Sequence, residues 1–425
     1  MGRNDDAWAA LFQQYQILEQ VRERGRFLIS AQQIKEYREP RLMTKFDHRV
    51  NLPALFRENG LAVLPVSRGD YLISSFEAYH TFEAPSGECQ QVSIPLRLQS
   101  LLPQFLVSEA IALNCAGASG ILSDFLGEEG LVSTVSGRMG SGSFSFGIQT
   151  AQGRSRVEVN NAQIEIDAAC EGPESLALFE AKRDLAEDFL IRQLYYPYRV
   201  WLGRVSKQVR PVFLTFANGV FQLYEYAFAD PEDYNALRLV RQKSYVIRTD
   251  ITRRDLWELL QSVRPEPEPE IPFPQADSLP RLLNLAELLS QGELTREEIT
   301  EEYAFDVRQT NYYTDAGRYL GLMEKRRENG AVLFRLTERG RAMMAMSYRE
   351  RMLTAGGAIL RHRPFREVFR LRLERDALPE PDGDSAYHAF RRAVPCGQRS
   401  DSAAQSLHGR KLVLLAGRFM LTWSR

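Results

Sequence analysis

A short segment rich in proline and glutamate divides the chain. Residues 264–274 read RPEPEPEIPFP. Proline lacks a backbone N–H and has a fixed φ angle, so this segment can form neither a helix nor a central strand. Pro-rich segments extend by about 3.1 Å per residue and act as semi-rigid spacers. We therefore expect a domain boundary at a linker over residues 263–277. The length of 425 residues agrees with more than one domain.

The composition is that of an ordinary globular protein, with 44% hydrophobic and 26% charged residues. No apolar run reaches the roughly 18 residues that a membrane span requires. The N-terminus is acidic and amphipathic, unlike a signal peptide. We expect a cytoplasmic protein with no membrane partner. The net charge of -1 gives no overall attraction to nucleic acid, so DNA binding would depend on local basic patches.

The cysteines indicate neither a zinc site nor a disulfide framework. No CxxC pair occurs, and no histidine stands at metal-ligand spacing. The four cysteines are Cys89, Cys115, Cys170 and Cys396.

Residues 1–100 read as helices followed by strands. Apolar residues at three- and four-residue spacing predict an amphipathic helix over 6–22, and a second helix is expected over 31–37. A basic segment follows, before two apolar runs that predict strands. Its basic residues are Arg38, Arg41, Lys45, His48 and Arg49. They suit a phosphate-contacting surface, although charge alone fits a solvated basic face equally well.

Residues 101–262 alternate helices with strands, which predicts an α/β domain. A helix with small residues is expected over 104–127, and strands over 144–148 and 156–159. A helix over 185–201 and two strands within 212–228 complete the pattern.

Two neighbouring strands of this domain carry charge at their ends. In QIEIDAACEGPESLALFEAKRD, residues 163–184, Ile164 and Ile166 face one side of the first strand, and Glu165 and Asp167 face the other. After the turn EGPES, the second strand ends on Glu180-Ala181-Lys182. Two carboxylates at adjacent strand ends could hold a magnesium ion, which prefers such oxygens.

Lys182 shares a strand face with Glu180, two residues away. It could orient or help to deprotonate an attacking water while the metal ion stabilises charge on a phosphate. This predicts metal-dependent hydrolysis of a phosphodiester. A solvent-facing hairpin that carries charge by chance is the alternative, because about a quarter of ordinary residues are charged.

Residues 278–345 predict a winged helix-turn-helix domain. Leucines line a first helix, Thr295 and Glu298 form a capping box for a second, and a third helix precedes a two-stranded ribbon that turns at 328–330. Its third helix would offer a groove the side chains Arg308, Gln309, Asn311, Tyr312 and Arg318. Arg326 and Arg327 on the ribbon would take phosphates. A protein-binding winged helix is the alternative.

The chain resembles the PD-(D/E)xK nucleases, and more narrowly bacterial type II restriction endonucleases. The resemblance spans about residues 8–375 and lies in six blocks: REPRLMTKFDH, LPVSRGDYLI, TVSGRMGSGSFSF, QIEIDAACEG, FEAKRDLAEDFLIRQLYYPYRVW and FDVRQTNYYTDAGRYLGL. It implies a restriction-endonuclease-like core, a mixed sheet flanked by helices, with Mg²⁺ as cofactor. The family's motif often begins with Pro-Asp, whereas this chain has Ile166-Asp167.

The resemblance also assigns roles to single residues. Asp167 and Glu180 become metal ligands and Lys182 the catalytic lysine, with Glu109 as a further candidate metal ligand. Gln193 and Tyr196 are similar to a glutamine-tyrosine helix motif that contacts the core and the DNA backbone. A buried aromatic helix face is the alternative for that helix.

Two further basic features would contact DNA. Arg138 lies in SGRMGSGSFSF, which lacks the lysine of a phosphate-binding Walker loop and is read as a β-turn beside DNA. In the segment 346–425, the stretch from Arg349 to Arg375 carries eight arginines against three acids. After about residue 376 the resemblance fades.

The sequence thus predicts a site-specific double-stranded DNA endonuclease that depends on magnesium. It would act as a homodimer on DNA, with a cognate DNA methyltransferase as its genetic partner. The alternatives are a repair or modification-dependent nuclease, and a winged-helix regulator whose nuclease core is inert.

Overall fold

The computed structural model describes residues 3–375 apart from residues 86–88, 96–97, 99, 102–107, 184–185, 218, 248–250, 252, 273, 277, 304, 329 and 347. The chain divides into two compact units. The first holds nearly all the described residues up to Ile247, and the second holds those from Ile251 onward. Cys396 and the rest of 376–425 lie outside the described residues.

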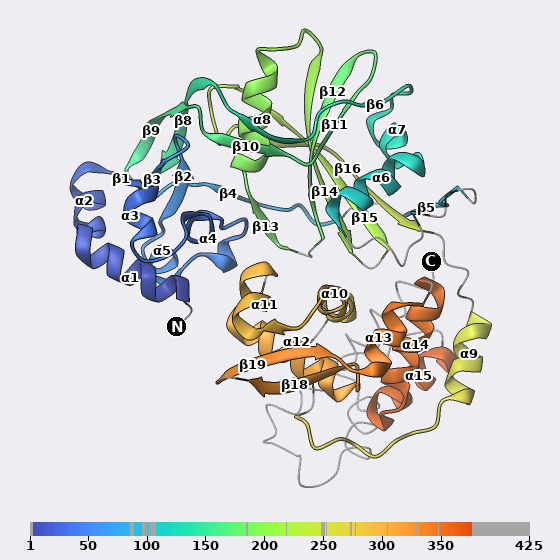
Figure 1. The fold of residues 1–425 in the computed structure, drawn as a ribbon. Coiled ribbons are helices and arrows are strands. Elements are labelled where there is room, and N and C mark those ends of the chain that lie inside the picture. The colour runs from blue at the N-terminus through green and yellow to red at the C-terminus, as the bar shows by residue number, and fades with distance from the viewer. Residues whose placement is uncertain are drawn as a thin grey trace. The chain divides into compact units, whose positions relative to one another are not determined.

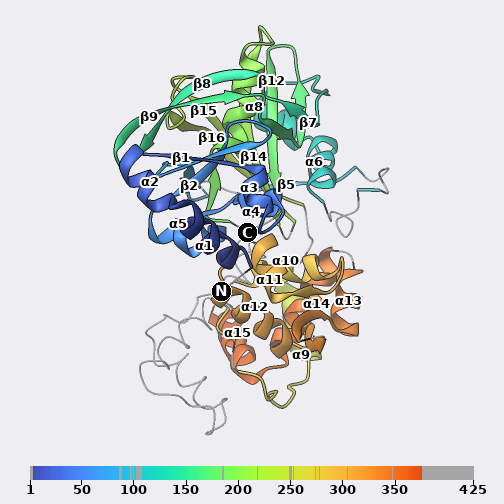
Figure 2. The ribbon, with the colours of Figure 1, turned by 60° about the vertical axis from the view of Figure 1, so that its left-hand side comes forward.

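The first unit begins with helices that surround a small antiparallel sheet (Figure 2). The helices are α1 (Arg3–Tyr15), α2 (Ile17–Arg24), α3 (Ala31–Lys35), α4 (Pro40–Thr44), the 3-10 helix η1 (Arg49–Asn51) and α5 (Ala54–Glu58). The strands β1 (Phe27–Ser30), β2 (Ala62–Pro65) and β3 (Asp70–Ser74) pair in the order β1-β3-β2.

The first helix is shorter than the sequence predicts. Gln16 has a φ of 49°, in the left-handed region, and so ends α1 before α2 begins. The apolar face of α1 is buried as expected, with Trp8 and Leu11 fully inaccessible to solvent. The indole N–H of Trp8 donates to the Met43 carbonyl at 2.9 Å, which ties α1 to α4.

A seven-stranded mixed sheet forms the centre of the first unit (Figure 1). Its strand order is β5 (Gln90–Val92), β16 (Leu237–Ile247), β15 (Val220–Phe228), β14 (Gln208–Ala217), β12 (Ser175–Lys182), β11 (Ala168–Glu171) and β6 (Val132–Ser133). Strand β12 runs parallel to β14 and antiparallel to β11. The expected α/β class is therefore confirmed.

Helices pack against the central strand β12. Every residue of β12 except Lys182 is buried, as is typical of a strand covered on both faces. Both α6 (Glu109–Ala118) and α8 (Arg192–Leu202) contact it. In Figure 1, α8 lies on one side of these strands, and α6 and α7 (Ile121–Leu126) lie on the other.

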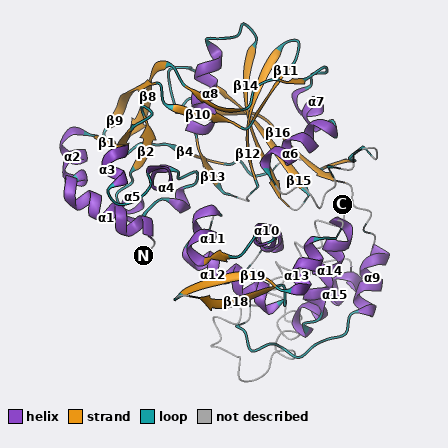
Figure 3. Ribbon diagram, in the orientation of Figure 1, coloured by secondary structure: helices purple, strands orange, loops and turns teal. Residues whose placement is uncertain are grey.

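Three two-stranded pairings complete the first unit (Figure 3). They join β7 (Gly137–Gly140) to β10 (Gln163–Ile166), β8 (Ser143–Thr150) to β9 (Gly153–Asn160), and β4 (Tyr79–Thr81) to β13 (Asp188–Leu190). The helix expected over 185–201 begins only at Arg192, because β13 pairs with β4 through residues 188–190. Arg138, expected in a turn, lies in strand β7.

The second unit combines helices with a small antiparallel sheet. Its elements are α9 (Arg253–Ser262), α10 (Leu279–Leu289), β17 (Leu294–Thr295), α11 (Arg296–Glu302), α12 (Val307–Tyr319), β18 (Met323–Glu328), β19 (Ala331–Leu336), α13 (Glu338–Met344), α14 (Tyr348–Leu360) and α15 (Arg363–Arg375). The sheet order is β17-β19-β18. The predicted capping box of Thr295 and Glu298 is present.

The Pro/Glu-rich segment differs from the expected spacer. It joins α9 to α10 inside the second unit, and α9 contacts α14 and α15 of the same unit. The Glu268 carboxylate accepts hydrogen bonds from Tyr319 and His362. The Glu266 amide donates to the Arg361 carbonyl at 2.8 Å. These contacts hold the segment against the helices of its own unit.

The arginines of α14 and α15 largely serve contacts within the second unit. Arg351 is 5% exposed, and it donates to Glu287 and to the Met344 carbonyl, both at 2.8 Å. Arg366 donates to the Leu260 and Val263 carbonyls. Arg349, Arg361 and Arg370 pair with acidic side chains. Five of the eight arginines from Arg349 to Arg375 thus take part in contacts within the second unit.

Candidate functional site

A pocket of about 220 Å³ in the first unit is lined mostly by charged residues. The acidic residues in its wall are Asp47, Glu109, Glu165, Asp167 and Glu180. The basic residues are Arg41, Lys45, Lys182 and Arg192, and the wall also includes Gln193. The pocket therefore brings the predicted Asp167, Glu180, Glu109 and Lys182 together with the predicted Arg41, Lys45 and Gln193. It also contains Asp47, Glu165 and Arg192, for which the sequence analysis predicted no role.

Asp167 lies at the break between β10 and β11. The alternation of β10 buries Ile164 and Ile166, as predicted, and leaves Gln163 and Glu165 exposed. After Asp167 the chain continues as β11, which pairs with β12 so that Ala168 stands opposite Phe179. The Asp167 carboxylate accepts the Ala181 backbone N–H at 2.8 Å. The two strand segments thus fix Asp167 beside Glu180 and Lys182.

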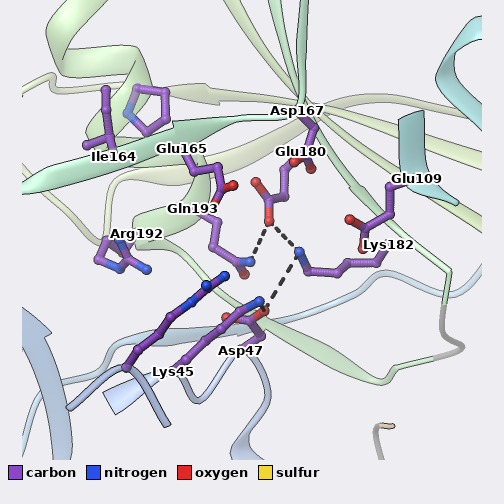
Figure 4. Close-up of a pocket in the computed structure, with 12 residues that line it drawn as sticks. Lys45, Asp47, Glu109, Ile164, Glu165, Asp167, Glu180, Lys182, Arg192 and Gln193 are labelled. Atoms are coloured by element: carbon purple, nitrogen blue, oxygen red, sulfur yellow. Dashed lines mark hydrogen bonds and ion pairs between the residues drawn. The ribbon is translucent and has the colours of Figure 1, made fainter. Parts of the chain in front are cut away.

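Glu180 lies at the centre of a short hydrogen-bond network (Figure 4). Its Oε1 accepts from Lys182 Nζ and from Gln193 Nε2, both at 2.6 Å. Gln193 is 8% exposed and comes from the first turn of α8, which packs against β12. The predicted Gln193 therefore belongs to the pocket, where it orients a carboxylate.

Asp47 and Arg192 are pocket residues that the sequence analysis missed. The Asp47 Oδ2 lies 3.7 Å from Lys182 Nζ and 3.8 Å from Lys45 Nζ. Asp47 comes from the loop after α4, far from β12 in the sequence. The only available signal for Asp47 was an acid placed inside the basic segment from Arg38 to Arg49.

Burial and charge together set the protonation of the site. Burial raises the pKa of Glu180 to about 7, with Asp167 and Asp47 adding to the increase and Lys182 opposing it. Burial also raises the pKa of Asp167, against the effect of Lys182. Burial disfavours a charged Lys182, but Glu180 and Asp47 outweigh it and hold the pKa of Lys182 well above its ordinary value. Lys182 is therefore an ammonium at neutral pH.

The chemistry of the donors fits a magnesium ion held by two carboxylates. Glu180 is buried and Asp167 is half-buried, and burial raises the pKa of both carboxyl groups. A divalent cation between them would favour their charged forms. Magnesium is commonly bound by one or two carboxylates, water and substrate phosphates. Among the described residues, no group of three or more His, Cys, Asp or Glu side chains could hold a metal ion. Glu109 lines the pocket but does not complete such a group.

Basic side chains form part of the pocket wall. Arg41 and Lys45 are exposed and come from α4 and the loop after it. Arg192 opens α8, and its guanidinium lies 5.8 Å from the centre of the Tyr196 ring. Arg192 Nε and Gln193 Oε1 are buried and make no hydrogen bond within the described part of the chain. The wall thus offers donors and an acceptor to a polar, anionic ligand.

Several predicted DNA-contacting residues of the first unit lie elsewhere. Tyr196 is fully buried and donates to the Pro65 carbonyl at 3.0 Å, so it is a core residue, as the alternative interpretation had it. Arg38 donates to Asn4 Oδ1 at 2.6 Å. Arg138 pairs with Glu165 at 3.3 Å. These three residues do not line the pocket.

The predicted recognition residues of the second unit show mixed exposure. On α12, Arg308 and Tyr312 are exposed, Asn311 is half-buried, and Arg318 pairs with Asp315 at 2.7 Å. Gln309 is occupied in the capping box of the same helix, with Asp306. On β18, Arg327 is exposed, whereas Arg326 pairs with Glu293 and Glu328.

Three family models match consecutive parts of the chain. Each is described as a domain of unknown function: DUF6996 matches residues 5–73, DUF6997 matches residues 74–246, and DUF7226 matches residues 281–402. No curated protein and no solved structure matches the chain. The pocket takes Arg41, Lys45 and Asp47 from the first matched region and its other residues from the second. Within the described residues, no helix has both the length and the apolar character to cross a bilayer.

Proposed function

We propose that the protein is a magnesium-dependent endonuclease that hydrolyses phosphodiester bonds of double-stranded DNA. The observation that carries the proposal is the gathering of Asp167, Glu180 and Lys182 in one pocket whose wall also bears Arg41, Lys45 and Arg192. Metal-dependent hydrolysis of a phosphodiester needs carboxylates that hold the metal ion. It also needs positively charged side chains that stabilise the phosphate, and this pocket offers both kinds of group.

Each residue of the pocket has a role in this proposal. Asp167 and Glu180 would hold Mg²⁺, which lowers the pKa of bound water and offsets charge on a phosphate. Gln193 fixes the Glu180 carboxylate through its 2.6 Å hydrogen bond. Lys182, charged at neutral pH, stabilises negative charge that develops on the scissile phosphate. Because it is protonated, Lys182 orients a water rather than deprotonating it.

The second unit supports a site-specific activity. Its order α10, α11, α12 and the ribbon β18–β19 supports the proposal of a winged helix-turn-helix, in which α12 would enter the major groove. Exposed Arg308 and Tyr312 on α12 and Arg327 on β18 are the side chains we propose for DNA contacts. In a cytoplasmic restriction enzyme of this kind, a cognate methyltransferase would protect host DNA.

The first test is cleavage of unmethylated phage DNA by the full chain in magnesium and in EDTA. Glu180→Gln and Lys182→Ala should each lower the cleavage rate by about 100-fold or more, because each removes a charged group at the reacting phosphate. Lys207→Ala is the matched control, since Lys207 pairs with Glu171 outside the pocket. Discrete fragments that require magnesium and both pocket residues support the proposal.

Other outcomes select the alternatives. Bound but uncut DNA would favour a winged-helix regulator. Cleavage confined to methylated, damaged or branched DNA would favour a modification-dependent or repair nuclease.

A further inference from the structure

We propose that Asp47 is a positioning residue for Lys182, so that the region preceding the seven-stranded sheet completes the active site. This inference rests on the proposed nuclease function and deepens it. Neither the strand pattern of residues 163–184 nor the basic character of residues 38–49 assigns Asp47 such a role.

The loop that carries Asp47 is anchored to β13 by three contacts. The Asp47 carbonyl accepts the Leu190 backbone N–H at 2.9 Å. His48 is 4% exposed, and its Nδ1 lies 2.5 Å from the Asp188 carbonyl oxygen. The Arg49 backbone N–H donates to Asp188 Oδ1 at 3.1 Å. These contacts hold the Asp47 carbonyl and the two residues after it against β13, which places the Asp47 carboxylate beside the pocket.

The Asp47 carboxylate faces cations in a largely water-excluded environment. Its side chain is 14% exposed and that of Lys182 is 12% exposed. At this burial an ion pair of 3.7 Å is stronger than the same pair in water. Burial works against the charge of Asp47, but Lys182 and Lys45 outweigh it and hold the pKa of Asp47 below its ordinary value. Asp47 therefore stays ionised and attracts the Lys182 ammonium.

Two of the carboxylates that act on Lys182 consequently have different tasks. Glu180 contacts it at 2.6 Å and is also a proposed ligand of magnesium, whereas Asp47 contacts it at 3.7 Å. A cation on Glu180 would weaken the pull of that carboxylate on Lys182. Asp47 then keeps the Lys182 Nζ directed into the pocket (Figure 4). Without Asp47 the ammonium could move, and small displacements of a reacting group lower rates strongly.

The kinetic test compares three full-length variants with the wild type. Asp47→Asn should lower kcat for DNA cleavage by about 10- to 100-fold, the usual loss for a group that orients a catalytic side chain. In the same variant, KM for DNA should stay the same or decrease, because loss of a negative charge does not weaken the attraction to phosphates. Asp47→Glu keeps the carboxylate and should restore part of the rate.

Glu171→Gln is the matched control. Glu171 also pairs with a lysine, Lys207 at 2.7 Å, but it lies outside the pocket. The control thus removes one carboxylate that is paired with a lysine and leaves the pocket unchanged. A wild-type kcat in Asp47→Asn, or an equal loss in Glu171→Gln, overturns the positioning role. Thermal unfolding of Asp47→Asn at the wild-type temperature shows that the loss in kcat does not come from misfolding.

A second measurement does not depend on nuclease activity. Brief exposure to an amine-specific acylating reagent, followed by mass spectrometry of the Lys182 peptide, reports how firmly the ammonium is held. Modification of Lys182 should rise severalfold in Asp47→Asn and stay at the wild-type level in Glu171→Gln. Equal modification of Lys182 in all three proteins overturns the inference. If the wild type cuts no DNA but this labelling difference is found, the nuclease proposal fails and the contact between Asp47 and Lys182 stands.

Discussion

At the scale of single residues, the pKa of Glu180 makes a prediction about metal binding. Because the pKa of Glu180 is about 7, protons compete with magnesium for this carboxylate below that pH. Magnesium affinity should therefore rise by up to about tenfold per pH unit toward pH 7, and level off above it. Titration calorimetry of the free protein with magnesium, from about pH 5.5 to about pH 8.5, would measure this change in affinity.

The control for this prediction is Glu180→Gln, whose amide does not titrate. Its residual magnesium affinity should show a weaker dependence on pH across the same range. A wild-type affinity that is constant from below to above neutral pH would mean that Glu180 is not a ligand.

The residues that sequence alone could identify are those set by local geometry. Asp167, Glu180 and Lys182 lie on or beside two consecutive strands, so alternation along each strand predicts which face they share. Asp47 could not be placed in this way, because its approach to Lys182 depends on how its loop packs on β13. Tyr196 was predicted to contact DNA, but its side chain is buried in the core. A single sequence does not distinguish an aromatic helix face that packs in the core from one that binds a ligand.

At the scale of elements, the arginines of α14 and α15 predict an effect on stability rather than on DNA binding. The side chain of Arg351 donates hydrogen bonds to Glu287 and to the Met344 carbonyl, and the residue is only 5% exposed. Arg351→Ala should therefore lower the free energy of opening α14 by about 3 kcal/mol, because it removes one partner of a buried ion pair. Hydrogen exchange of the α14 amides would measure this change.

Arg363→Ala is the matched control, because Arg363 is an exposed arginine at the start of α15. Its effect on exchange should stay within about 0.5 kcal/mol. Loss of DNA affinity in Arg351→Ala with unchanged exchange in α14 would contradict this interpretation.

Elements were predictable where local signals agree with packing. The capping boxes of α11 and α12 begin those helices whatever lies around them, and the described ends of β18 and β19 match the expected ribbon. The first helix and the helix over 185–201 were predicted too long. In the first case Gln16 adopts a left-handed conformation, and in the second β13 pairs with a distant strand. Apolar periodicity reveals neither the left-handed conformation of Gln16 nor the pairing of β13 with β4.

At the scale of the whole molecule, the proposed function predicts that two chains act together on DNA. The described part of the chain gathers Asp167, Glu180 and Lys182 in a single pocket. In the proposed function, one such pocket would cut one strand at a time. A homodimer with twofold symmetry would place two pockets on the two strands of a palindromic site. Cleavage of both strands in one binding event then depends on both chains being active.

Mixing experiments with the full chain test this dimer. Wild-type protein is combined with an increasing excess of Glu180→Gln, and a supercoiled plasmid with one target site is the substrate. Because most wild-type chains then pair with an inactive chain, nicked circles should accumulate at the expense of linear DNA. Lys207→Ala, mixed in the same proportions, should leave linear DNA as the main product, since its pocket is intact. Linear product that persists at every ratio of Glu180→Gln would show that a single chain cuts both strands in turn.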